Sequence, residues 1–429
     1  MNRRIALSIA LGALLAGGVA SAQEVTIGYQ GLPSKSSGES NTGLQIADGV
    51  LLHAGIGAEA GYDTNVFYAP TNLVGSSIFR FMPYAEITNA TRTGPVSKEL
   101  TFDVRGGLQY RHYGNSEVSS NYRDAWNPNA GVSVSLGGAQ FGFGFADVFA
   151  RVEDPPYSSG GAGTGAGIER TNNQASIEGR WSPGGGRLTG LLRFTNMVNF
   201  YDTSTLGPTY SYANAMTNTL MLDVAWKWLP KTAIFLNISQ SYVDYFNQEQ
   251  ATLNQLSASY PLYVTTGLRG LLTEKTSAVL TLGYVNAFYS NGASTTGFLG
   301  STYLDLAFTA RLTQLSRALL GFRHDFINAV ISNFAYEETV YASYVQQIAG
   351  RLGLDLSGRY AYLSYQGATG DPTQQGRVDN YFQLGATLDY FLRNWAYLGV
   401  GYSLLDNRSN IASNDYLKQQ VFARLGITY

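Results

Sequence analysis

The sequence ends with "QQVFARLGITY" (residues 419–429), in which apolar side chains alternate with other residues. One set of alternate positions is apolar or aromatic: Val421, Ala423, Leu425, Ile427 and Tyr429. The other set is mostly polar or small, and Phe422 interrupts it: Gln420, Arg424, Gly426 and Thr428. A period of two is typical of a β-strand whose two faces meet different surroundings. Because terminal residues usually fray, we expect a neighbouring strand to hold Tyr429 in place.

The N-terminus has the pattern of a secretory signal peptide. Arg3 and Arg4 precede an apolar run, and Ala20, Ser21 and Ala22 form a small-residue cleavage site. The alternative is a membrane anchor, but the run is short for a spanning helix. We therefore expect residues 1–22 to be removed, which takes the formal net charge from −2 to −4 because two arginines are lost.

The composition suggests strands with a lipid-facing side. Charged residues make up 14% of the chain, against about 25% in typical soluble proteins. The mean hydropathy is only −0.08, and 49 Gly, 30 Tyr and 21 Phe take the place of the missing charges. The sequence has no cysteine, which excludes disulfides, thiolate metal ligands and a cysteine nucleophile.

The alternation seen at the C-terminus recurs along the chain. Residues 101–111, 303–312, 352–362 and 382–392 repeat it, with Leu, Phe or Val on one side and Asp, Arg, Gln or Thr on the other. About eighteen such segments predict an all-β fold, a transmembrane antiparallel β-barrel of 16–18 strands. A soluble β-sandwich is the alternative. The expected strands begin near Val50, Ser76, Lys98, Trp126, Ala139, Glu169, Arg187, Tyr212, Lys231, Ser259, Lys275, Gly297, Ser316, Tyr336, Arg351, Gly376, Asn394 and Tyr416.

Short and long connections alternate between these segments. The connections at 229–231, 273–275 and 349–350 are short, whereas those at 153–169 and 247–258 are long and polar. Outer-membrane barrels have short periplasmic turns and longer extracellular loops. We therefore predict a bacterial outer-membrane protein with both termini in the periplasm. The domains expected are a signal peptide (1–22), a flexible periplasmic segment (23–48) and the barrel (49–429).

The polar face of the strands predicts the lining of a lumen. Barrels of this size commonly enclose an aqueous channel. Two interpretations stay open, a structural ladder of ion pairs and a polar path for a large hydrophilic solute, and no charge sign dominates. The lumen-lining candidates are Asp103, Arg105, Arg269, Tyr303, Asp305, Arg311, Arg323, Asp325, Asp355, Arg359, Asp389 and Arg424.

Catalysis is not expected. The three histidines, His53, His112 and His324, lie in no hydrolase or zinc motif. We therefore predict no enzyme activity, no cofactor, no metal and no nucleic-acid partner.

The stretch "GIGAEAGYDTNVFYAP" (55–70) resembles the first strand and loop of a family of β-barrel porins, the beta-barrel porin 2 type. The resemblance rests on Gly61-Tyr62-Asp63, Asn65 and Phe67. Such proteins are associated with exopolysaccharide and capsule export, so the resemblance implies translocation of a polysaccharide. Its expected partners are the polymer, a periplasmic polysaccharide export protein, the barrel-assembly machinery and outer-membrane lipids. The alternatives are a general or solute-specific diffusion porin and a structural or adhesive barrel.

The terminal residues Leu425, Ile427 and Tyr429 resemble the C-terminal signal by which outer-membrane barrels are recognised for assembly. We expect Tyr429→Asp to impair insertion, because the closing strand loses its interfacial aromatic anchor. Heat-modifiable migration on a gel measures the folded fraction. Normal amounts of folded membrane protein in the variant would contradict the assembly role.

Overall fold

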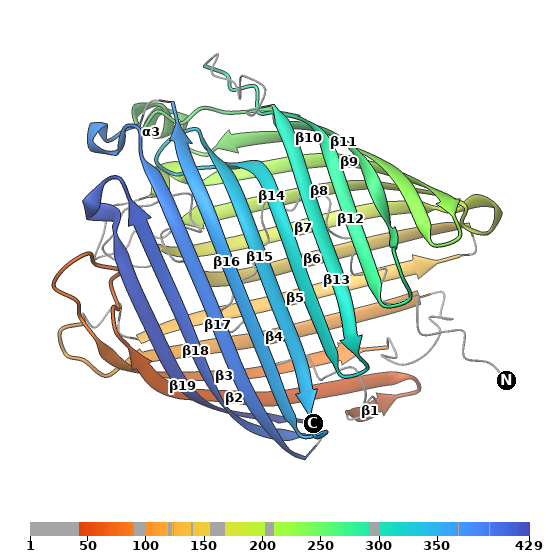
Figure 1. Cartoon of the computed structure of the whole chain (residues 1–429), viewed down its shortest axis with the longest axis horizontal. Coiled ribbons are helices and arrows are strands. Elements are labelled where there is room, and N and C mark those ends of the chain that lie inside the picture. Colours follow the sequence, from red (N-terminus) through yellow and green to blue (C-terminus); the bar gives the residue numbers. More distant parts are fainter. Residues whose placement is uncertain are drawn as a thin grey trace.

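The computed structural model describes residues 43–89, 100–118, 122, 124–138, 140–154, 168–201, 210–291, 301–367, 369–393 and 395–429. Eighteen antiparallel strands form a closed barrel, and a short additional strand, β1 (Leu44–Ala47), pairs with the first of them (Figure 1). No helix in these ranges is long and apolar enough to cross a membrane. The barrel strands are β2 (Val50–Asp63), β3 (Ser76–Thr88), β4 (Leu100–Tyr113), β5 (Asp124–Gly137), β6 (Phe141–Asp154), β7 (Ile168–Trp181), β8 (Leu188–Tyr201), β9 (Ala215–Leu229), β10 (Thr232–Tyr245), β11 (Leu262–Leu271), β12 (Thr276–Asn286), β13 (Thr302–Thr313), β14 (Ser316–Asn328), β15 (Phe334–Ile348), β16 (Leu352–Gln366), β17 (Val378–Arg393), β18 (Ala396–Ser409) and β19 (Tyr416–Thr428).

The last strand closes the barrel onto the first. β19 pairs with β2 from Gln420 opposite Asp63 to Thr428 opposite Gly55. The final residue continues this ladder: the Tyr429 amide donates to the Ala54 carbonyl at 2.8 Å, and the Ala54 amide donates back at 3.3 Å. The pairing supplies the neighbour expected for the C-terminal strand. Closure leaves no sheet edge, which in lipid would expose unpaired backbone groups.

The predicted fold class and strand count are confirmed. The expected starts at Val50, Ser76, Ser316 and Tyr416 coincide with observed strand starts, and the expected start at Tyr212 falls three residues before Ala215. The 3-10 turn η2 (Ser211–Ala213) occupies those intervening residues, a local hydrogen-bonding choice that alternation does not reveal. The predicted signal peptide lies outside the described residues.

The segment 23–48, expected to be flexible, contains one ordered element. Its residues up to 42 lie outside the described ranges, but β1 pairs with β2 at Leu44 opposite Leu52 and Gln45 opposite Leu51. Figure 1 shows β1 and the C-terminus at one end of the barrel and the short helix α3 (Gln248–Leu253) at the other. The end with β1 and the C-terminus carries the short turns. Its assignment to the periplasm remains a prediction.

Strand register separates the two faces of the wall. Residues directly opposite each other in antiparallel strands point to the same face. Leu306 lies opposite Leu280 on β12 and Phe322 on β14, which continues an apolar outward row. The neighbouring Asp305 lies opposite Thr281 and Arg323, which belong to the inward face.

Phe422 is an inward residue and not an interruption of the pattern. It lies opposite Gly61 on β2 and Gly401 on β18, and its side chain is 1% exposed. The Arg80 guanidinium lies 4.6 Å from its ring centroid. Glycines on both neighbouring strands leave room for the ring to lie flat on the inner wall. An aromatic residue can therefore occupy an inward position at which the alternating pattern predicts a polar residue.

The face assignment is testable at one pair of positions on β13. Leu306→Arg should destabilise the folded barrel by roughly 2–4 kcal/mol if the position lies near the membrane midplane. Arg311→Ala should leave folding nearly unchanged, because Arg311 is exposed on the inward face. Urea titration of the heat-modifiable folded form compares the two. Equal losses of stability would contradict the assignment.

Candidate functional site

The inward face carries ion pairs that lie along the wall. Asp389 on β17 reaches Arg424 on β19 across the intervening strand β18, with 3.4 Å between Oδ1 and Nε. The residue crossed is Gly399, where an added Cβ would lie only 2.0 Å from the Asp389 carboxylate oxygen. A side chain at this position would displace the carboxylate. Glycine therefore permits an ion pair between strands that are not neighbours.

A second group of polar contacts lines β11 to β16. Arg323 and Asp305 pair at 3.4 Å, and Arg359 is bonded to Glu337 with both side chains nearly inaccessible. The Tyr263 hydroxyl donates to Asp325 at 3.2 Å, and the Tyr303 ring meets the Tyr263 ring edge-on at 5.9 Å.

The remaining wall repeats this arrangement. Glu178 on β7 accepts from Arg193 on β8 at 2.6 Å, and Asp223 on β9 pairs with Arg269 on β11 at 3.3 Å. The Arg269 guanidinium also lies 5.1 Å from the centre of the Phe235 ring. Charges of both signs are thus neutralised along the wall, which keeps most of these side chains out of the lumen centre.

Three arginines differ from this pattern. Among the described residues, no ion pair involves Arg105, Arg311 or Arg317. Arg311 and Arg317 lie directly opposite each other on β13 and β14, and both are exposed, as is Arg105 on β4. Like charges in opposite positions repel each other. All three are exposed cations of the inward face.

The loop at 64–75 is anchored to the inner wall by a buried lysine. Lys418 on β19 is 2% exposed and lies 2.8 Å from the carboxylate of Asp63, which is fully buried. Its ammonium also donates to the carbonyls of Asn65 (3.0 Å) and Val66 (3.3 Å). One cation therefore holds the end of β2 and the first turn of the loop.

Aromatic packing completes this anchor. The Lys418 ammonium lies 4.1 Å from the centre of the Tyr68 ring, and Tyr68 packs edge-on against Tyr416 at 5.2 Å. Tyr68 is clustered with Leu363 and Tyr381, residues of the inward face of β16 and β17. Burial raises the pKa of the Tyr68 hydroxyl well above its usual range, so the ring stays neutral in this pocket.

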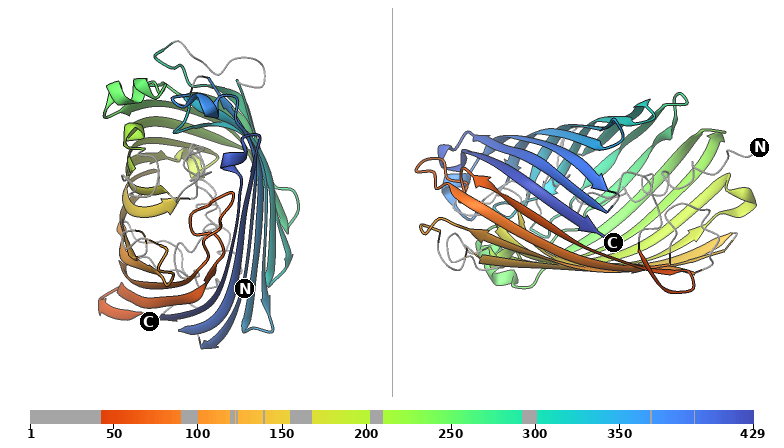
Figure 2. Two further views of the ribbon diagram at one scale, coloured as in Figure 1. Left: turned by 90° about the vertical axis from the view of Figure 1, so that its left-hand side faces the viewer. Right: turned by 90° about the horizontal axis from the view of Figure 1, so that it is seen from below.

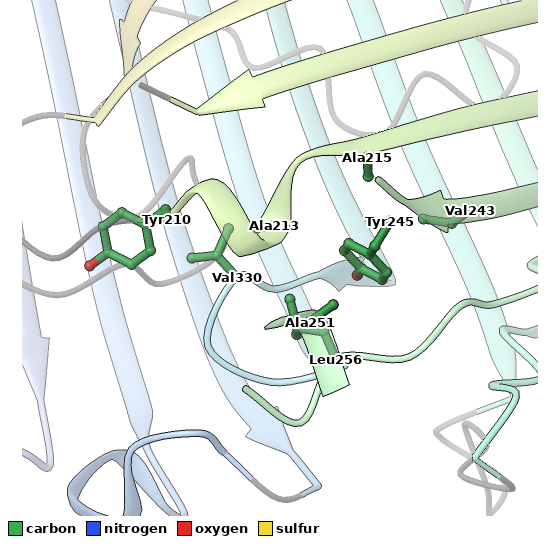
Figure 3. Packing of buried hydrophobic residues seen from close by; sticks show 8 residues of the cluster. All are labelled: Tyr210, Ala213, Ala215, Val243, Tyr245, Ala251, Leu256 and Val330. Carbon is green, nitrogen blue, oxygen red and sulfur yellow. The ribbon is translucent and has the colours of Figure 1, made fainter. Parts of the chain in front are cut away.

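Other loops gather at the same end of the barrel. Tyr210 and Ala213 precede β9, Leu256 follows α3, and Val330 follows β14 (Figure 3). They form one buried cluster, which joins the connections beside the neighbouring strands β9 and β10 to the connection that follows β14. The Ser257 amide donates to the Asn333 side chain at 3.0 Å, and the Tyr289 hydroxyl donates to the Asn333 carbonyl at 3.0 Å. Figure 2, left, looks onto this end and shows segments within the oval outline of the wall.

The structure brings some predicted lumen residues together and separates others. Asp305 contacts Arg323, and Asp389 contacts Arg424. The partners of three others were not predicted, because Arg269 binds Asp223, Arg359 binds Glu337, and Asp325 binds Tyr263. By register, three further candidates also point inward: Asp103, Arg105 and Asp355. Their role as the lining of a solute path remains a prediction.

The sequence alone could not predict the contacts of several residues that stabilise the barrel, because those contacts depend on strand register and loop folding. Glu337 and Glu338 are adjacent, so one must face inward and the other outward, and only the register with β16 decides which. Lys418 and Asp63 lie two positions apart in the β2–β19 register, and their pairing depends on where the loop folds. Parity along the final strand could have placed Lys418 inward, but not its loop contacts.

The histidines occupy separate places. His112 Nδ1 lies 2.7 Å from Asp124 and His324 Nδ1 lies 3.7 Å from Glu338, in both cases on the outward face near the loop end. His53 lies opposite Glu86 on the inward face of β2. Among the described residues, no group of three or more potential metal ligands is close enough to hold an ion.

No family model matches the chain, and no curated protein matches it. The resemblance to the beta-barrel porin 2 family therefore has no further support. Solved structures with a similar fold include OccAB4 from Acinetobacter baumannii, at 10% identity over 88% of this chain and 98% of that chain (TM-score 0.47). The outer membrane protein OpdK from Pseudomonas aeruginosa has 12% identity over 88% and 99% (TM-score 0.48). A mutant ferric enterobactin receptor PfeA from the same species has 8% identity over 88% and 80% (TM-score 0.45). Similarity at this level carries no information about what this chain transports.

The Lys418 anchor makes a measurable prediction. Lys418→Met should destabilise the protein by about 3 kcal/mol, the lower end of the range for breaking a buried ion pair. Three hydrogen bonds to Asp63 remain, from the Asn65 amide, the Tyr113 hydroxyl and the Gln420 amide. The measurement is urea unfolding followed by tryptophan fluorescence, together with protease cleavage within 64–75.

Lys275→Met is the matched control, because Lys275 is exposed in a short turn. Adding Asp63→Asn to Lys418→Met should recover part of the loss, since the uncompensated charge disappears. Unfolding midpoints that are equal for the wild type, the control and Lys418→Met would show that the pair does not stabilise the loop.

Proposed function

We propose that this protein is an outer-membrane channel through which hydrophilic solutes diffuse passively. The observation that carries the proposal is the closed wall itself, whose outward rows are apolar and whose inward rows carry charged and hydroxyl side chains. An apolar outer band suits lipid, and barrels of this strand number enclose an aqueous lumen.

The loop layer supports passage of small solutes in preference to a polymer. The buried cluster of Tyr210, Leu256 and Val330 joins loops from separate parts of the rim, and Tyr68 is packed on the inner wall. A polysaccharide chain would need an opening beside these packed segments. The export hypothesis therefore rests on the sequence resemblance alone. A structural or adhesive role would leave the charged inner wall without a purpose.

The wall chemistry favours weak charge selectivity. The ion pairs of the wall neutralise each other, and a pore selective for one sign would present an excess of the other. Arg105 is exposed and forms no ion pair among the described residues, although it lies opposite Glu86 on β3, so it adds some positive potential along the path of an anion. We infer a channel that admits both cations and anions, with a modest preference for anions.

Reconstitution in planar bilayers tests this function. Wild-type protein should form open channels in KCl. Under a salt gradient, the reversal potential should be shifted slightly from zero toward the value of an anion-selective channel. Arg105→Glu should move the reversal potential toward cations. Arg408→Glu is the matched control, because Arg408 is on the outward face and its side chain is 73% exposed.

Liposome swelling with neutral sugars of increasing size should show a size limit. Folded protein that gives neither conductance nor swelling would contradict the channel function. If the protein is closed to small sugars and its deletion removes surface polysaccharide from cells, export of the polymer replaces diffusion as the function.

A further inference from the structure

A row of polar side chains crosses the outward face of β6 to β9 between apolar side chains of the same strands. Asp147 on β6 lies opposite Ala175 on β7, which lies opposite Asn196 on β8, which lies opposite Asn218 on β9. Asn173 on β7 lies beside this row and donates to Asp147 at 2.5 Å. We call Asp147, Asn173, Asn196 and Asn218 the polar belt. On β4 and β5 the same row continues as Val104 and Val132, which are apolar.

On β6 and β8 the belt lies within the apolar band. On β9 it reaches the polar rim, because Asn218 lies opposite Tyr242 of β10, whose neighbours on the same face are Gln240 and Asp244. On β8, Phe194 and Leu192 lie on one side of Asn196, and Val198 and Phe200 lie on the other. On β6, Phe145 and Phe149 flank Asp147 in the same way. A position two residues along a strand is displaced by about 7 Å. Asp147 and Asn196 are therefore bracketed by apolar side chains toward both ends of the barrel.

Hydrogen bonds within the polar belt do not use all of its donors and acceptors. Besides the bond between Asn173 and Asp147, Asn196 donates to the Asn218 carbonyl oxygen at 2.9 Å. Within the described part of the chain, no further bond engages the second carboxylate oxygen of Asp147, the carbonyl oxygens of Asn173 and Asn196, or the Asn218 amide nitrogen. All four side chains are partly exposed. Hydrocarbon offers no partner for the free groups of Asp147 and Asn196, which lie in the apolar band.

The chemistry of the free groups indicates what covers them. The β6 side of the belt presents the carboxylate, which accepts hydrogen bonds, and the β9 side presents an amide that donates them. Two copies of the belt therefore complement each other, whereas acyl chains complement neither. We infer that β6–β9 form a subunit interface at which a second copy of this chain covers the polar belt.

Cysteine cross-linking in native membranes tests the interface, because the chain has no cysteine of its own. The probes are the single variants Asp147→Cys, Asn196→Cys and Asn218→Cys, and a mixture of Asp147→Cys with Asn218→Cys. Val400→Cys is the matched control, since Val400 is 55% exposed on the outward face of β18. A bismaleimide should give covalent dimers of this chain in the belt variants or in the mixture, and none in the control.

Three results would overturn the interface. The first is that the belt variants fold but yield no dimer. The second is that Val400→Cys gives equally abundant dimers, which would indicate random collision. The third is that the cross-linked products contain a different protein. The last two outcomes leave the channel activity measured in bilayers untouched, so they are distinguishable from failure of the proposed function.

A second variant separates association from folding. Asn196→Leu combined with Asn218→Leu should keep heat-modifiable folding, because leucine suits a lipid-facing position, and should shift the native mass in mild detergent from oligomer to monomer. Gln419→Leu, on the outward face of β19, is the polar-to-leucine control and should keep the wild-type mass. A wild-type protein that is already monomeric in mild detergent and in membranes would contradict the inference.

Discussion

This structure depends on one constraint: without water around it, each backbone N–H and C=O group of a strand needs a hydrogen-bond partner within the protein. A strand that faces lipid must pair on both edges, and only a closed ladder provides that for every strand. The pairing of β19 with β2, extended to the Tyr429 amide and the Ala54 carbonyl, supplies the last missing neighbour. Once the ladder is closed, the alternation of side chains divides them between an inner and an outer surface.

Closure also shapes the inner wall. On a concave surface, side chains from alternate strands come close enough to bond, as Asp389 and Arg424 do across Gly399. Gly321 has a comparable place, since an added Cβ there would lie 2.1 Å from the Tyr341 ring. Small residues on one strand thus let long residues of the next lie along the wall.

The two ends of the barrel use different chemistry. At the end with β1 and the C-terminus, short turns leave the exposed Arg311 and Arg317 side by side. At the other end, longer connections fold onto the inner wall through buried aromatic and aliphatic clusters, and the Lys418 ammonium holds the first of them. Packed loops therefore lie at one end of the barrel, and exposed charges lie at the other.

The sequence by itself determined the fold class, the strand count and the approximate strand starts, because a wall with one lipid-facing and one water-facing side imposes a period of two on each strand. It also determined which polar residues occupy alternate positions. Only the tertiary structure decided how they combine. Adjacent residues such as Glu337 and Glu338 are divided by strand register, Phe422 fits inward because Gly61 and Gly401 flank it, and Lys418 gains its partners from a loop fold. The polar belt likewise became visible only when Asp147, Asn196 and Asn218 aligned across strands, since alternation within one strand cannot show which residues of other strands share its row.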